Sequence, residues 1–79
     1  MNRNHRNYYH YQVLKKLASG KTIIDMPNVH GFRIAGDRRG KMYGNTILRE
    51  LREGKLVTTD NRITADGRMW LILAKTGLV

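Results

Sequence analysis

The chain has 79 residues with no cysteine, and its fifteen Lys and Arg against six Asp and Glu give a formal net charge of +9. A chain of this length forms one small domain and buries only ~60% of the surface that its unfolded form exposes. The absence of cysteine excludes disulfides and thiolate metal sites, and the longest apolar run, 69–74, is far shorter than the ~20 residues of a membrane helix. We therefore expect a soluble, cytoplasmic domain over residues 8–79 that follows a flexible basic arm at 1–7.

The excess of positive charge is typical of a protein that binds a polyanion. Nucleic acid is the partner class that this charge favours. The alternatives are an anionic lipid surface, an acidic protein surface, or charge that serves only solubility.

The first periodic segment follows the arm. Val13, Leu14 and Leu17 share one helical face, and Ser19-Gly20 forms a stop signal, so the pattern predicts a helix over 8–19. The tyrosines at the start of this helix either pack against the domain or offer a stacking platform for bases.

Two short β-branched or alternating runs come next, at 21–26 and 31–36, separated by Pro27-Asn28. Runs of this length with a turn between them predict a β-hairpin at about 21–35. Pro27 and the neighbouring glycines argue against a long helix in this place.

A basic turn spans 37–41 and leads into the second helix. Its amides and the cations Arg38, Arg39 and Lys41 are suited to hold phosphates near a helix N-terminus. The alternative is a solvated glycine-rich turn, and the glycine spacing does not match a nucleotide-binding loop.

The second helix is predicted at about 43–53 from the apolar stripe of Ile47, Leu48 and Leu51. Gly54 stands where a helix commonly ends in the left-handed conformation.

The face opposite that stripe carries Asn45, Arg49 and Arg52, at i, i+4 and i+7. Arginine pairs bidentately with guanine, and asparagine pairs in the same way with adenine, so this face is suited to read bases. Glu50 and Glu53 lie beside the arginines and would repel phosphates, which leaves a merely charged, exposed helix as the alternative.

Two short runs, 56–59 and 62–64, flank Asp60-Asn61 and predict a small hairpin at 55–64. Thr64 is then placed to cap a last helix at 65–76, with Gly67 allowing close packing in its first turn.

The order L-x-x-L-x-x-G-x-L-V, short hairpin, I-T-x-x-G-R-x-x-L covers about a third of the chain. It resembles the recognition helix, wing and following helix of winged helix-turn-helix DNA-binding proteins. The resemblance implies a small winged-helix-like α+β domain, with the 43–53 helix in the major groove and the 55–64 hairpin on the DNA backbone, where Arg62 is the contact. The departure from the family pattern is the 21–35 hairpin, which stands where a supporting helix is expected.

The last helix is apolar on every side over 69–74, more than one small core covers. We expect a homodimer anchored by Trp70, Ile72 or Leu73; complete burial by the first helix is the alternative.

The chain shows no acid–base pair, no metal-ligand spacing and no phosphate loop in the right context, so we expect neither an enzyme nor a cofactor or metal site. The main hypothesis is a double-stranded DNA-binding protein, a small transcriptional regulator. The alternative is a protein-interaction module that binds through its apolar last helix, and RNA stays open as a ligand because the same charge suits an A-form helix.

Overall fold

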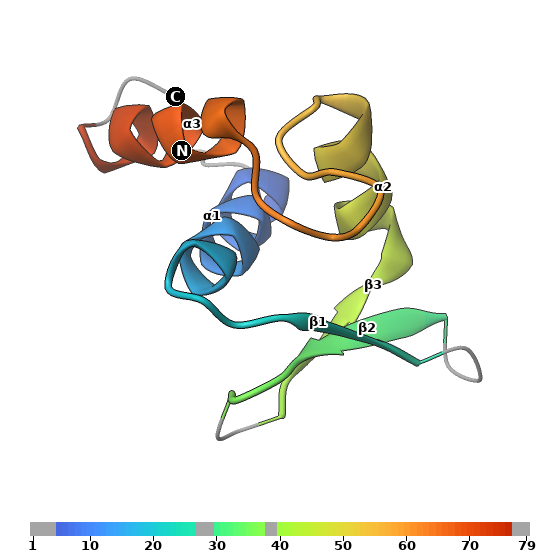
Figure 1. Cartoon of the computed structure of the whole chain (residues 1–79). Coiled ribbons are helices and arrows are strands. Elements are labelled where there is room, and N and C mark those ends of the chain that lie inside the picture. Colours follow the sequence, from blue (N-terminus) through green and yellow to red (C-terminus); the bar gives the residue numbers. More distant parts are fainter. Residues whose placement is uncertain (1–4, 27–29, 38–39, 77–79) are drawn as a thin grey trace.

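The computed structural model describes residues 5–26, 30–37 and 40–76 (Figure 1). Three helices and a three-stranded antiparallel sheet follow in the order α1, β1, β2, β3, α2, α3. The fold class is thus α+β, as predicted. Residues 1–4 of the predicted arm, together with Arg38 and Arg39, lie outside the described residues.

Helix α1 spans His5–Ala18 and so begins three residues before the predicted 8–19 helix. It ends where the sequence indicates, because Gly20 adopts the left-handed region at φ 100° and its amide donates to the carbonyl of Leu17 at 3.1 Å.

The sheet confirms the predicted hairpin and adds a strand to it. β1 (Ile23–Met26) pairs antiparallel with β2 (Gly31–Ile34), and β2 pairs with β3 (Met42–Gly44), which places Phe32 opposite Tyr43. The prediction that the second helix begins at about residue 43 is wrong, because Tyr43 lies in β3. The cause is a long-range contact, since the buried ring of Tyr43 stacks on that of Phe32 with centroids 5.3 Å apart.

Helix α2 spans Asn45–Glu53. Its C-terminus corrects a second prediction, because Gly54 has φ −80° and the left-handed residue is Lys55, at φ 61°. The amide of Leu56 donates to the carbonyl of Leu51 at 2.9 Å, the bond that closes a helix end of this kind.

The 55–64 segment folds back on itself as a hairpin, but its two sides form a single bridge, Val57 to Ile63, instead of regular strands. The amide of Thr58 donates to the carbonyl of Arg62 at 2.8 Å. Asn61 takes the left-handed conformation at φ 66°, as expected of an asparagine in a tight turn.

Helix α3 spans Ala65–Lys75 and is capped as predicted, because the hydroxyl of Thr64 accepts from the amide of Gly67 at 2.9 Å. Gly67 is buried against the 55–64 hairpin. A Cβ on this residue would lie 2.3 Å from the carbonyl oxygen of Leu56 and 2.7 Å from Cγ1 of Ile63.

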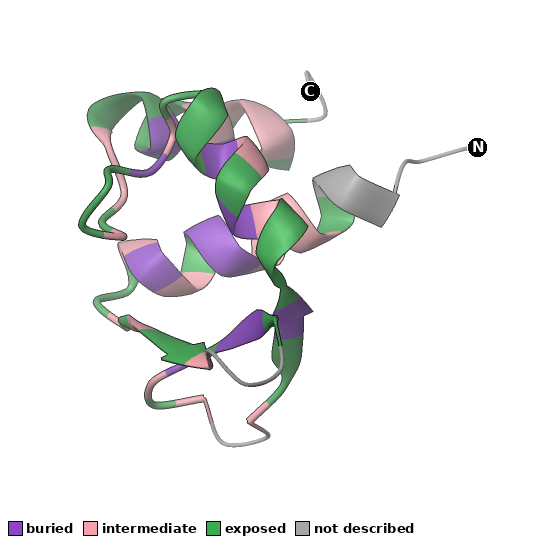
Figure 2. Cartoon of the chain, turned by 90° about the vertical axis from the view of Figure 1, so that its right-hand side faces the viewer, coloured by how far each residue is buried: buried purple, intermediate pink, exposed green. Residues whose placement is uncertain are grey.

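Helix α1 lies in the middle of the molecule, with the sheet on one side and α2 and α3 on the other, as Figures 1 and 2 both show. Buried residues from all three layers form one core cluster. The residues of this core are Val13, Leu14, Leu17, Phe32, Ile34, Tyr43, Leu48, Leu51, Val57 and Leu71. This arrangement leaves one side of α2 facing solvent.

Candidate nucleic-acid interface

The solvent-facing side of α2 carries the three residues that the sequence predicts to read bases. Asn45, Arg49 and Arg52 are all exposed and together line one shallow depression of about 310 Å³. Leu48 and the carboxylate-bearing Asp25 of β1 complete its described lining. The predicted set therefore forms one surface, with an acidic residue from the sheet that the sequence analysis missed.

A side-chain hydrogen bond joins this surface to the 55–64 hairpin. Nη2 of Arg52 donates to Oδ1 of Asn61 at the hairpin turn. Because Asn61 also has a fixed left-handed backbone, the bond holds the turn beside the exposed side of α2. The helix and the hairpin are thus one continuous surface.

Of the two glutamates that lie beside the arginines in the sequence, Glu50 points away from the proposed base-reading face. Oε1 of Glu50 lies 3.0 Å from Nε2 of His10 on α1, and both side chains are mostly buried. The carboxylate of Glu50 is therefore engaged on the α1 side of α2. Glu53 is exposed, and on a helical wheel it stands between Glu50 and the face of Asn45 and Arg49.

Lys41 is exposed at the start of β3, as a backbone contact requires, and its ammonium lies over two aromatic rings. Nζ is 4.7 Å from the ring centroid of Tyr9 and 5.5 Å from that of Tyr43. Contacts of this kind hold a cation without neutralising its charge. Tyr9 packs on the core and lies under this lysine, so fewer tyrosines are left for the base-stacking platform that the sequence suggests.

A second lysine anchors the turn before β3. Nζ of Lys16 donates to Oδ2 of Asp37 at 2.6 Å and to the hydroxyl of Tyr43 at 3.3 Å. The bond to Asp37 raises the pKa of Lys16 above the ordinary lysine value, against an opposing effect of burial. This pair fixes one end of the basic turn whose other predicted cations, Arg38 and Arg39, lie outside the described residues.

Arg62 is exposed on the hairpin and lines a second depression of about 320 Å³. Two further cations share it, Lys21 from the segment between α1 and β1 and Arg68 from α3. Asn61 lines the same depression, so this cluster continues the surface of α2. Sequence reasoning missed Lys21 and Arg68 because they come from segments that only the tertiary fold brings to the hairpin.

The predicted dimer anchors differ in exposure. Ile72 is 56% exposed and its neighbour Met69 is 54% exposed, while Leu73 is half-buried. The indole of Trp70 packs against the core. Part of the apolar last helix thus faces solvent, and part of it is covered by the rest of the domain.

Among residues 5–26, 30–37 and 40–76, no three His, Asp or Glu side chains gather closely enough to hold a metal ion. Within the same residues, no helix combines the length and the apolar character needed to cross a bilayer. No family model, curated protein or solved structure matches the chain.

Proposed function

We propose that this protein is a small winged-helix-like protein that binds double-stranded DNA, with α2 in the major groove, and acts as a transcriptional regulator. The observation that carries the proposal is the single exposed surface formed by Asn45, Arg49 and Arg52, tied to the 55–64 hairpin through Asn61. The net charge of +9 supplies the attraction to phosphates that such binding requires.

In this proposal the three residues have different tasks. Arg49 is exposed, and among the described residues its guanidinium has no ion-pair partner, which leaves its donors for O6 and N7 of guanine. Asn45, at the start of the helix, pairs with adenine. Arg52 divides its donors between a base and Asn61, so that it also positions the hairpin.

Asp25 belongs to the same surface and changes its chemistry. A carboxylate among the lining residues disfavours phosphates in the depression and can accept hydrogen bonds from the amino group of cytosine. We therefore place the DNA backbone on cations outside the depression, namely Lys41 and Arg62, together with Arg38 and Arg39 of the basic turn.

The support of α2 differs from that in the family which the sequence resembles. The hairpin of β1 and β2, extended by β3, occupies the part of the chain where that family has a helix, and α2 follows directly from β3. Helix α1 packs against α2 from the inside, so the recognition surface still rests on a helix. The docking angle on DNA is therefore specific to this arrangement.

The test is a selection from a pool of randomised DNA duplexes, followed by fluorescence anisotropy on the selected site. Arg49→Ala is expected to cost ~1–3 kcal/mol on that site and to relax preference at one base pair, whereas Arg62→Ala weakens all duplexes about equally. Lys55→Ala, which removes one exposed cation from the base of the hairpin, is the matched control. If no sequence is enriched, or if an RNA hairpin of equal length binds more tightly, the proposal fails.

We place the dimer contact on the outer side of α3, where Met69 and Leu73 are one helical turn apart and Ile72 is adjacent. A two-fold dimer would present two copies of α2 to successive half-sites of the duplex. Light scattering behind size-exclusion chromatography tests this part separately. A monomer at high micromolar concentration would contradict it and leave the DNA-binding surface intact.

A further inference from the structure

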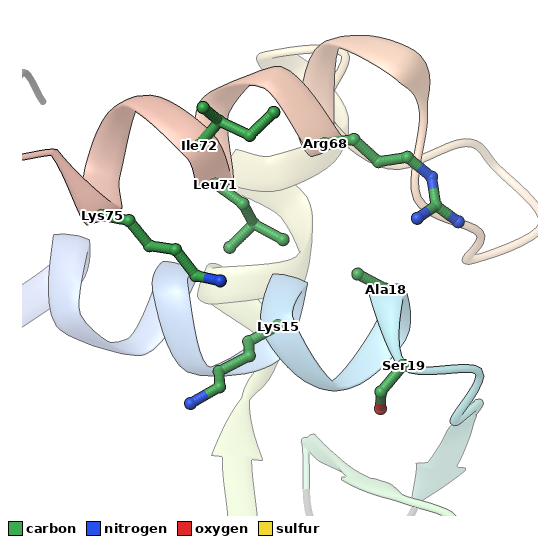
Figure 3. A pocket seen from close by; sticks show the side chains of 7 residues that line it. All are labelled: Lys15, Ala18, Ser19, Arg68, Leu71, Ile72 and Lys75. Carbon is green, nitrogen blue, oxygen red and sulfur yellow. The ribbon is translucent and has the colours of Figure 1, made fainter.

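A groove runs between α1 and α3, apart from the depression on α2; of its lining residues, Ile72 also belongs to the proposed dimer contact. Its volume is about 460 Å³, and Ala18 of α1 and Leu71 and Ile72 of α3 give it an apolar lining (Figure 3). Figure 3 shows Leu71 extending from α3 toward α1, with Ala18 facing it. The groove therefore has an apolar floor between two packed helices.

Three cations among the described residues line this groove. Lys15 of α1 and Arg68 and Lys75 of α3 line it and are exposed, and none of the described lining residues is acidic. Figure 3 shows the side chain of Lys75 reaching from α3 toward α1 across the opening. An occupant must thus cover apolar surface and neutralise positive charge at the same time.

These two requirements decide between classes of occupant. A second copy of the chain would bring its own Lys15, Arg68 and Lys75 against the same residues, and like charges brought together in an interface are costly. A nucleic acid would satisfy the cations, but its phosphates and sugars offer no apolar surface to cover Ile72, which is 56% exposed. A helix with apolar residues on one face and Asp or Glu beside them satisfies both requirements.

We propose that the groove between α1 and α3 is a docking site for an acidic amphipathic helix of a partner protein. Apolar side chains of the partner, spaced at i, i+3 and i+4, pack on Leu71 and Ile72 and over Ala18. Its carboxylates pair with Lys15 and Lys75 on the two sides of the groove. Such a site lets a DNA-bound protein recruit a second protein, but the docking itself does not depend on DNA binding.

The groove shares no described lining residue with the depression on α2. One of its cations, Arg68, also lines the depression beside Arg62. A test on Lys15 and Lys75 therefore separates peptide docking from contacts to DNA.

The experiment uses the full 79-residue chain as bait for a phage-displayed library of random peptides, each about 16 residues long. Enriched peptides are expected to combine Leu, Ile or Phe at helical spacing with several Asp or Glu. In a titration of isotope-labelled protein, they are expected to shift the amide signals of Leu71 and Ile72, and to leave those of Asn45 and Arg49 unchanged.

The double variant Lys15→Glu, Lys75→Glu is expected to weaken the enriched peptides by roughly tenfold or more, while Lys55→Glu, an exposed charge reversal outside the groove, leaves them bound. Both variants change exposed residues, and circular dichroism checks that they fold. Lys15 and Lys75 lie outside the proposed DNA surface, so the double variant is expected to bind DNA at high salt as tightly as the original chain.

Three results would overturn the proposal. Enriched peptides that are neutral or basic would remove the charge argument, and peptides that bind the double variant as tightly as the original would place the site elsewhere. Binding of the chain to phosphatidylserine vesicles that the double variant alone abolishes, without any peptide enrichment, would assign the groove to a membrane surface. Each of these results leaves the DNA-binding proposal standing, and loss of DNA binding leaves the groove proposal standing.

Discussion

Oε1 of Glu50 on α2 lies 3.0 Å from Nε2 of His10 on α1, which commits this carboxylate to the interior side of the helix. Glu53, the last residue of α2, is exposed and has no such partner among the residues that the structure describes. Two glutamates on one short helix thus have different surroundings, and the difference decides how acidic the proposed DNA surface is.

Replacing each glutamate by alanine separates the two roles. Glu50→Ala is expected to lower the free energy of unfolding by ~1 kcal/mol, because His10 loses a mostly buried partner. Glu53→Ala is expected to leave stability nearly unchanged and to raise affinity for duplex DNA by roughly threefold at low salt, as one repulsive charge leaves the rim. Both variants change the net charge equally, so each controls for the other. Urea denaturation and fluorescence anisotropy give the two readouts, and identical behaviour of the variants would contradict this assignment.

Lys55 occupies the left-handed region at φ 61°, directly after Gly54, the C-cap residue of α2. Lys55→Gly is expected to raise the free energy of unfolding by roughly 0.5–1 kcal/mol, because glycine adopts this conformation without steric cost. Lys55→Ala removes the same charge and keeps the strain, so its stability is expected to match that of the original chain. Thermal or urea unfolding measures both.

Asn61 is the contrasting case, since it also has a positive φ, 66°, but its side chain accepts from Arg52. Asn61→Gly is therefore expected to gain nothing in stability and to weaken DNA binding, because the hairpin is no longer held beside α2. A gain as large as that of Lys55→Gly would show that the hydrogen bond contributes nothing to the fold.

Gly67 lies in the first turn of α3, where an ordinary helix would favour alanine by ~1 kcal/mol. Gly67→Ala is nevertheless expected to destabilise the protein by about 2–3 kcal/mol, because its Cβ would lie 2.3 Å from the backbone oxygen of Leu56. Gly44→Ser is the control: no atom lies within 4 Å of a Cβ there, and the backbone is already extended at the N-cap of α2. This second variant is expected to be neutral or to stabilise by up to ~1 kcal/mol, as the hydroxyl caps the helix.

Lys16 and Asp37 give a pH dependence with a definite sign. Folding raises the pKa of Lys16 above 10.5, chiefly through its hydrogen bond to Asp37. The contribution of this charge is thus fully present below pH 10.5 and is lost as the pH rises through the raised pKa.

Asp37→Asn is accordingly expected to be less stable than the original chain by ~1 kcal/mol at pH 7 to 9, with the gap narrowing above pH 10.5. Asp60→Asn makes the same chemical change at an exposed turn and is expected to show no gap. Urea denaturation across this pH range measures both, and a gap for Asp37→Asn that stays constant through pH 11 would contradict the ion pair.

The sequence predicts those elements that are determined by residues close together in the chain. The stripe of Ile47, Leu48 and Leu51 placed α2, and the hydroxyl of Thr64 placed the start of α3 to the residue. The start of α2 was misplaced because no Ser, Thr, Asp or Asn precedes it: Gly44 holds the N-cap without a side-chain bond. No residue pattern around Tyr43 predicts that it pairs with Phe32 in the sheet.

The candidate site follows the same division. Helical spacing was sufficient to bring Asn45, Arg49 and Arg52 to one face, and the structure gathers them in one depression. The contacts that change the charge of this face come from distant segments. His10 binds Glu50 across 40 positions of the chain, and Asp25 comes from β1. Tertiary contacts of this kind leave no periodic signal in a single sequence.

The central claim is that α2 and the surrounding cations bind duplex DNA, and its most direct test is a titration of the selected duplex at several salt concentrations. The four proposed backbone cations, Arg38, Arg39, Lys41 and Arg62, predict that log K falls against log salt with a slope of about −3 to −4, at ~0.9 per phosphate. Arg62→Ala is expected to reduce that slope by about 1. Failure to bind duplex DNA at low salt, or an affinity that does not change with salt, would contradict the account.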